Sequence, residues 1–118
     1  MTWQALLKAL EDVQAMIGHM VGVAMESQEN PKEIYKIGLN TSRLLMATGD
    51  LIIAWLLLRQ ADIAQSKLAN AGRDTEFYNG KIASAKFFVR SVLPHISVER
   101  AVVESENGEI MNIAEAAF

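Results

Sequence analysis

The side chains that most often do chemistry in proteins stand in no catalytic pattern in this sequence. The chain has no cysteine, which excludes disulfides, thiol nucleophiles and thiolate metal sites. Its seven glycines are scattered, and no phosphate-binding or dinucleotide-binding glycine pattern can be drawn from them. A Gly-x-Ser-x-Gly nucleophile motif is also absent. The residues alone therefore predict no active site and no catalytic residue within these 118 residues.

The two histidines do not stand at metal-binding spacings. A di-iron helical bundle needs Glu-x-x-His pairs, but Met16 stands three residues before His19 and Val92 three residues before His95. We expect His19 to be a surface or hydrogen-bonded core residue, and His95 to be solvated in a turn. No metal site is predicted.

Four charged residues remain as candidates for a site. Asp50 is the one carboxylate within an apolar run, where it could be a tuned acid or base. We favour a structural role, in which it pairs with a cation of a neighbouring helix or points outward between buried neighbours. Lys81, Lys86 and Arg90 recur at spacings of 5 and 4, and predict a modest basic edge. Such edges are usually solvated, but this one could contact phosphate or another domain.

Composition indicates one folded domain, residues 1–118. The chain is 51% hydrophobic and 21% charged, and its net charge is −3. Neither half is basic, which argues against nucleic-acid binding. The N-terminus lacks a basic signal-peptide region. The most apolar stretch, residues 44–58, is shorter than the roughly 20 residues of a membrane span. We therefore expect a buried core helix and a soluble, cytoplasmic protein.

The first helix is expected over residues 2–28, with Thr2 as its N-cap. Gly18 and Gly22 share one face and would let a neighbouring backbone approach closely. One apolar stripe follows spacings of 4, 3, 4, 3 and 4 along this helix. Its members are Leu6, Leu10, Val13, Ile17, Met20 and Ala24.

The second helix is expected over residues 31–70. Asn30 caps it, Pro31 takes its first position and Glu33 completes a capping-box-like pattern, while Gly72 follows its end. Because residues 51–58 are apolar all round, this should be the long central helix, buried on several sides. A break at residues 38–41, with a new helix starting there, is an open alternative.

The third helix starts after Asp74 and ends or kinks at Leu93, because Pro94 disfavours helical geometry there. A fourth, over residues 97–106, stops at Asn107 and Gly108, and the tail either docks or adds a turn. The third helix should bury Tyr78, Ile82, Ala85, Phe88, Val89 and Val92, and the fourth has Val98, Ala101, Val102 and Ser105 on one side. Short connections predict an all-α fold, an antiparallel up-down bundle of three to four helices.

Methionines and aromatic residues are expected to fill the interior. Met16, Met20, Met25 and Met46 suit gaps in a core or an interface better than a ligand site. Large aromatic anchors are more often core residues than surfaces on which a cofactor stacks. The large aromatic anchors of this chain are Trp55, Phe87 and Phe88.

Two blocks of residues, in this order, resemble the C-terminal helical domain of the larger acyl-CoA dehydrogenase-like flavoenzymes (the acetyl-CoA dehydrogenase C-terminal-like domain). They lie within residues 49–94, although the order of elements is similar over the whole chain. The first block matches at Gly49, Asp50, Ala54, Trp55, Arg59, Gln60 and Ala61. The second matches at Phe77, Tyr78, Gly80, Lys81, Phe87, Phe88, Leu93 and Pro94.

This resemblance implies the last part of a longer enzyme, with Met1 at the start of a partial chain or of a split gene. In that family the flavin-binding and acyl-binding domains come first, together with the catalytic glutamate. The parent enzyme would be a FAD-dependent acyl-CoA dehydrogenase, and this part would carry no catalytic residue and no cofactor. It would pack on the catalytic body or on a neighbouring subunit of a homo-oligomer. Lys81, Lys86 and Arg90 would then contact phosphate or a neighbouring domain.

Two other interpretations stay open. One is a standalone helical interaction module that oligomerises through its apolar faces without catalysis. The other is a bundle that binds a small ligand near Asp50.

Overall fold

The computed structural model describes residues 2–118 and contains four α-helices joined by short connections. They are α1 (Thr2–Glu26), α2 (Ile34–Lys67), α3 (Thr75–Ser91) and α4 (His95–Ser105). Short 3-10 helices cover Pro31–Glu33, Leu68–Asn70, Gly72–Asp74, Glu109–Asn112 and Glu115–Ala117. Since no strand occurs over residues 2–118, the predicted all-α class is confirmed.

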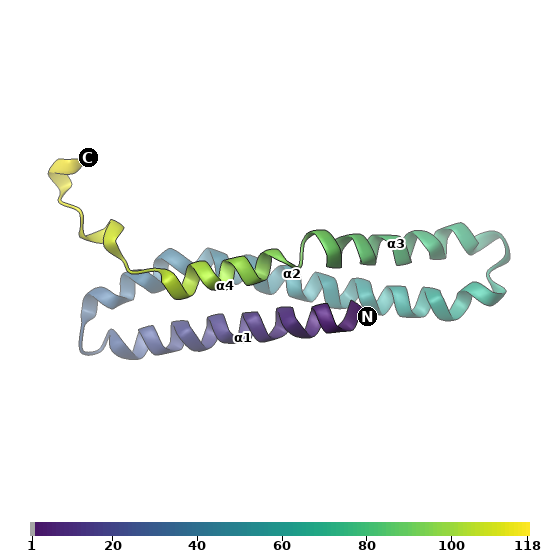
Figure 1. The fold of residues 1–118 in the computed structure, drawn as a ribbon, viewed down its shortest axis with the longest axis horizontal. Coiled ribbons are helices and arrows are strands. Elements are labelled where there is room, and N and C mark those ends of the chain that lie inside the picture. The colour runs from purple at the N-terminus through teal and green to yellow at the C-terminus, as the bar shows by residue number, and fades with distance from the viewer. Residues whose placement is uncertain (1) are drawn as a thin grey trace.

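The long helix α2 organises the other three. It contacts α1, α3 and α4, and α1 also contacts α4. Helices α3 and α4 follow one another along α2, while α1 lies beside the part of α2 that α4 also covers (Figure 1). The molecule is therefore a rod of 67 × 29 × 16 Å. Three helices form one end of it, and α2 and α3 alone form the other.

The start of the second helical segment is confirmed in position but not in its capping bonds. Asn30 is extended (φ −125°) and Pro31 takes the first helical position, as its fixed φ favours. The Asn30 side chain makes no capping hydrogen bond. Glu33 pairs instead with Lys36, one turn ahead, at 2.6 Å.

Helix α2 runs unbroken through residues 38–41, so the alternative break is not formed. Asn40 is buried, and the Thr41 hydroxyl donates to the Ile37 carbonyl at 2.7 Å within the helix.

The two glycines that were predicted to follow the ends of the second and fourth helices are confirmed in that role. Gly72 and Gly108 adopt φ values of +54° and +75°, the left-handed conformation that favours glycine.

Pro94 separates α3 from α4, as predicted. Asp74 holds the N-cap position of α3, without a side-chain capping bond. The fourth helix begins earlier than expected, so His95 is its first residue rather than part of a turn. Its side chain is exposed, in agreement with the predicted solvation. The predicted N-cap of α1, Thr2, has a side chain outside the described residues.

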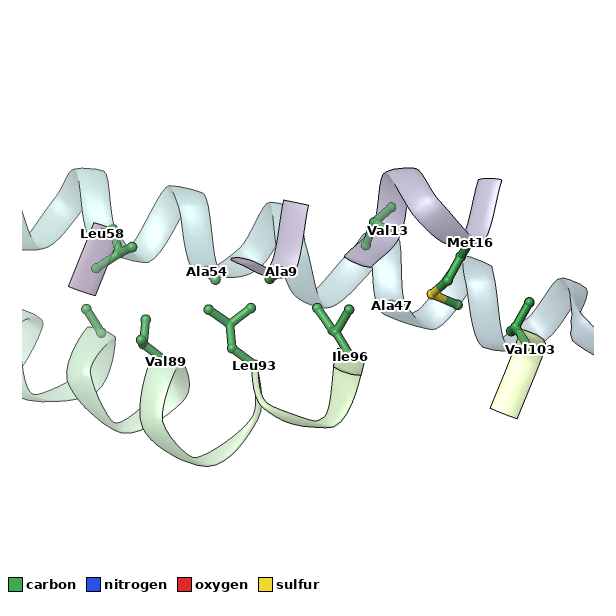
Figure 2. Close-up of a cluster of buried hydrophobic side chains, with 11 residues drawn as sticks. Ala9, Val13, Met16, Ala47, Ala54, Leu58, Val89, Leu93, Ile96 and Val103 are labelled. Carbon is green, nitrogen blue, oxygen red and sulfur yellow. The ribbon is translucent and has the colours of Figure 1, made fainter. Parts of the chain in front are cut away.

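The core lies where α1, α2, α3 and α4 meet (Figure 2). Alanine side chains are short, so the helix backbones can lie close together where the core contains alanine. Longer side chains from α3, α4 and the turn between them, including Leu93 and Ile96, point toward α2 (Figure 2). The buried cluster contains Ala9, Val13, Met16, Ala47, Ala54, Leu58, Ala85, Val89, Leu93, Ile96 and Val103.

Several predicted buried faces need correction. On α1 the apolar line is rotated, because Ala9 and Met16 are buried whereas Leu10 and Ile17 are exposed. On α4 the buried residues are Ile96 and Val103. The predicted α4 face is wrong, since Val98 and Ala101 are exposed and Ser105 is too. Helix α3 buries Ala85 and Val89 fully and the other four predicted residues in part.

The apolar segment 51–58 is buried on one side only. Ala54 and Leu58 are buried, whereas Ile52, Ile53 and Leu56 are exposed. By length and composition alone, Pro31–Asn70 could cross a membrane, and 17% of its most apolar window is buried in this fold. The core helix of a soluble protein passes the same test, so this result carries no assignment to a membrane.

The two glycines of α1 meet no neighbour, so the expected close approach is not made within this chain. A Cβ atom built on Gly18 or Gly22 would have no heavy atom within 4 Å.

The C-terminal tail forms two short 3-10 turns, is exposed, and extends away from the helices (Figure 1).

Candidate functional site

The three basic residues of the predicted edge do not lie on one face. At 3.6 residues per turn, Lys86 and Arg90 are about 40° apart around α3, whereas Lys81 and Lys86 are about 140° apart. Lys81 and Lys86 line different clefts on opposite sides of the contact between α2 and α3. The predicted edge is therefore a pair, Lys86 and Arg90, with Lys81 on the other side.

Lys81 is held by aromatic side chains. Its Nζ lies 5.3 Å from the centre of the Phe77 ring, and that ring packs edge-on against Tyr78 at 5.5 Å. A cation over an aromatic face is attracted by the ring quadrupole. The cleft beside Lys81 is about 160 Å³ and almost entirely apolar, with Ile63 and Ala64 of α2 on its other wall.

Lys86 and Arg90 are exposed to solvent. Lys86 lines a cleft of about 140 Å³, in which Asp62 and Gln65 of α2 are the polar residues. Neither cation forms an ion pair with residues 2–118. Both are free to meet an anion or a carboxylate from outside the chain.

Asp50 lies in a charged cleft between α2 and α4. The cleft is about 320 Å³ and also contains Arg43, His95 and Glu99. Arg43 pairs with Glu99 at 2.9 Å and so joins the two helices. Asp50 is half-buried and, within the described chain, makes no hydrogen bond or ion pair. The predicted pairing with a cation is therefore not formed, and Asp50 lines the cleft instead.

The most buried charge is one that the sequence did not single out. Asp12 of α1 is 1% exposed and lies against α4. Its Oδ1 accepts from Lys8 at 2.6 Å and from Arg100 at 2.9 Å, and its Oδ2 accepts from Ser97 at 2.6 Å. This cluster, named the Asp12 cluster below, fastens the first helix to the last.

The electrostatics of the Asp12 cluster favour the ionised carboxylate. Burial raises the pKa of Asp12, but the hydrogen bonds from Lys8, Ser97 and Arg100 more than offset it, and the pKa lies below the usual 3.8. Only the Lys8 and Asp12 spacing of four was visible in the sequence. Ser97 and Arg100 are 85 and 88 residues away. The cluster has the geometry of a structural clamp.

Two of the three expected aromatic core anchors are on the surface. Phe88 packs against the core, but Trp55 and Phe87 are exposed. The methionines divide in the same way. Met16 is buried and Met20 packs on the core, whereas Met25 and Met46 are exposed. Among residues 2–118, no group of three or more histidine, aspartate or glutamate side chains could hold a metal.

Residues that carry the resemblance to the dehydrogenase domain contribute to packing and to the surface. The Arg59 guanidinium lies over the Trp55 ring at 5.2 Å, and both residues face outward from α2. Gly49 is half-buried with no heavy atom within 4 Å of a Cβ built on it. The block in α3 supplies the Phe77–Tyr78 contact and the half-buried Phe88.

Comparison with known proteins decides the family. Residues 1–114 match the family described as "Acetyl-CoA dehydrogenase C-terminal like". The chain belongs to this family. The resemblance seen in the two blocks of residues is thereby confirmed over nearly the whole chain.

Individual relatives agree with this membership. The chain is 45% identical to a broad-specificity linear acyl-CoA dehydrogenase of Mycobacterium tuberculosis, over 99% of this chain and 20% of that protein. It is 34% identical to a butyryl-CoA dehydrogenase of Syntrophomonas wolfei, over 70% of this chain and 14% of that protein. It is 30% identical to a 3-methylmercaptopropionyl-CoA dehydrogenase of Ruegeria pomeroyi, over 92% of this chain and 17% of that protein.

The chain spans a fifth or less of the length of these relatives. The match to the mycobacterial protein lies in its C-terminal part. The shared region is therefore a domain of larger dehydrogenases.

Proposed function

We propose that this chain is the C-terminal accessory domain of a FAD-dependent acyl-CoA dehydrogenase. The observation that carries the proposal is the family match over residues 1–114 combined with coverage of only a fifth of a relative. The parent enzyme would remove the α-proton of an acyl-CoA thioester and transfer a hydride from the β-carbon to the flavin. In that parent the domain has no active site of its own, and its contribution is packing and positioning.

The clefts of this chain do not fit a flavin dinucleotide. The clefts beside Asp12, Asp50, Lys81 and Lys86 hold about 350, 320, 160 and 140 Å³. Pockets for drug-sized ligands occupy about 300–1,000 Å³, and a flavin dinucleotide, being larger than such a ligand, needs the upper part of that range. We therefore place FAD and the acyl chain in the preceding domains and assign no step of the reaction to a residue of this chain.

The exposed apolar surface supports docking on the catalytic body. At the end of the rod that α1 does not reach, α2 and α3 form only a helix pair, and Phe77 and Ile63, which line one cleft between them, are exposed there. Exposed apolar patches of this kind mark interaction sites. We propose that the antiparallel bundle is completed by helices of the body or of a neighbouring subunit in a cytoplasmic homo-oligomer.

We further propose that Lys86 and Arg90 contact phosphate or an adjacent domain, with Lys81 making a separate contact. In the full-length dehydrogenase, reversal of charge in Lys86→Glu/Arg90→Glu should raise KM for acyl-CoA and leave kcat nearly unchanged. Lys81→Glu should act independently, because it lies across the contact between α2 and α3. Unchanged kinetics in the double variant and in Lys81→Glu would remove these contacts from the proposal.

The alternative is a standalone helical module that oligomerises through the same apolar surface. An immunoblot of source-cell lysate, with an antibody raised against this chain, separates the two. The proposal expects a band about five times heavier than 13.0 kDa, because the chain spans 20% of its mycobacterial relative. A band at 13.0 kDa, with no flavoprotein co-purifying, would favour the standalone module.

A further inference from the structure

Helix α2 carries a second apolar stripe on the side away from the core. Its residues follow spacings of 4, 3, 4, 3 and 4, which is the heptad pattern of packed helices. The stripe consists of Leu45, Gly49, Ile52, Leu56, Arg59 and Ile63. Its four large apolar side chains are between 44% and 69% exposed. An exposed apolar stripe of this kind marks a surface that another element covers.

Helix α1 carries a matching stripe. Trp3, Leu7, Leu10, Gln14, Ile17 and Val21 also follow spacings of 4, 3, 4, 3 and 4. The five apolar members are between 38% and 58% exposed. The two stripes together are named the outer face below.

The two stripes flank one groove between α1 and α2, and Leu10 of one stripe and Ile52 of the other line it. The groove is about 220 Å³, has no polar surface, and is also lined by Leu6, Leu51 and Trp55. Two parallel ridges with an apolar groove between them fit the side chains of a third helix. Gly49 adds a gap on the α2 ridge, where a Cβ atom would meet nothing within 4 Å. The geometry therefore suits a helix better than a small ligand.

Arg59 indicates the charge of the occupant. Its guanidinium lies 5.2 Å from the Trp55 ring at the edge of the groove and makes no ion pair with any described side chain. Neither stripe contains an acidic residue, so a second copy placed stripe on stripe would offer Arg59 no carboxylate from either stripe. Covering an unpaired guanidinium is strongly unfavourable, because the charge loses its water without gaining a partner. The charge pattern favours a different segment that carries an Asp or Glu.

The length of the relatives indicates where that segment lies. Four-fifths of the mycobacterial relative lies outside the region that this chain matches. We propose that the outer face binds an amphipathic helix of the preceding dehydrogenase part of the same polypeptide. That helix has apolar side chains at heptad spacing and a carboxylate that pairs with Arg59. This inference rests on the proposed function and adds to it the face used and the chemistry of its partner.

Cysteine labelling can test the face, since the chain has no cysteine of its own. In the full-length dehydrogenase, Leu56→Cys reports on the outer face and Gln28→Cys, in the turn after α1, serves as the control. Phe87→Cys reports on an exposed apolar position of α3 that lies outside the outer face. Each site is treated with a maleimide, and its modification rate is read from its own peptide by mass spectrometry, with the urea-unfolded protein as reference.

The proposal expects Leu56→Cys to react at least tenfold more slowly than Gln28→Cys in the folded enzyme, and equally fast in urea. Equal rates in the folded enzyme would overturn it. If Phe87→Cys alone were protected, the domain would dock by another face, so the inference would fail and the proposed function would stand. If neither site were protected, the inference would fail and so would the proposed docking of the domain on the catalytic body, whereas the immunoblot alone decides whether the chain belongs to a larger enzyme. Should Leu56→Cys not fold, Ile52→Cys takes its place.

Two further results separate the named partner from a second copy. Adding Arg59→Glu to Leu56→Cys should raise its modification rate at least tenfold, because two carboxylates would then face one another. Arg73→Glu, at another exposed arginine, should leave that rate unchanged. Protection of Leu56→Cys that disappears on dilution to monomers would overturn the proposal in favour of a second copy.

Discussion

The two faces of α2 differ in the size of their side chains as well as in burial. The inner face, toward the core, combines the small Ala47 and Ala54 with Leu58, while the four apolar residues of the outer stripe are all large: Leu45, Ile52, Leu56 and Ile63. Small inner residues let α1, α3 and α4 approach closely. Large outer residues bury apolar area only when a partner arrives. Both faces of α2 carry apolar residues at helical spacing, so the sequence pattern does not tell them apart. Only the packing of α1, α3 and α4 against one of them shows which face belongs to the core.

The largest effect expected from this comparison is at Leu58. Leu58→Ala on the inner face should lower the free energy of unfolding of the chain by about 2–5 kcal/mol, because it removes a buried side chain and leaves a cavity. Urea denaturation of the purified chain measures this. A loss below about 1 kcal/mol would show that the inner face is not the core.

The clamp between α1 and α4 should give the next largest effect. Asp12→Asn keeps the size of the side chain but removes the charge that Lys8 and Arg100 pair with. The expected loss is about 1.5–3 kcal/mol, the usual range for hydrogen bonds to charged groups. Asp74→Asn, at an exposed position without a capping bond, is the matched control and should change stability by less than about 0.5 kcal/mol.

Acid should remove the contribution of the Asp12 carboxylate to the free energy of unfolding. Because the folded-state pKa of Asp12 lies below 3.8, the unfolded chain takes up its proton first as the pH falls. The contribution is complete above the unfolded-state pKa and is lost as the pH drops below it toward the folded value. The stability difference between wild type and Asp12→Asn should therefore be constant from about pH 7 to 5 and shrink below about pH 4, by chemical denaturation at each pH. A difference that grows on acidification would contradict the lowered pKa.

The smallest effect should come from the outer face. Leu56→Ala, two residues from Leu58 and with the same chemical change, should alter the stability of the isolated chain by less than about 0.5 kcal/mol. In the full-length enzyme the same substitution should lower stability by clearly more, if a partner covers the face. Equal, large losses for Leu56→Ala and Leu58→Ala in the isolated chain would abolish the distinction between the faces.

Local signals predicted the elements well. Pro31, Pro94, Gly72 and Gly108 fall where the structure starts, separates or ends its helices, because their effects on φ and on backbone hydrogen bonding act within a few residues. The two blocks of matching residues also identified the family. Burial was predicted less well, since Leu10 and Trp55 have the spacing of core residues and are exposed.

The candidate site was predictable only in part. Lys86 and Arg90 share a face, as a spacing of four requires, but Lys81 lies across the contact between α2 and α3. The Asp12 cluster could not be found from the sequence, since it joins residues of the first and last helices. Such a contact depends on the docking of α1 against α4, which no short-range pattern encodes.

The order of residues alone was enough to define a set of helices with their ends, and the family to which the chain belongs. Both properties depend on local geometry and on residue identities along the chain. Which of two equivalent apolar stripes on α1 and α2 is internal became visible only in the packed molecule, because hydrophobicity is non-directional. Close approach at alanines, together with the Asp12 cluster, selects one face for the core and leaves the other for a partner.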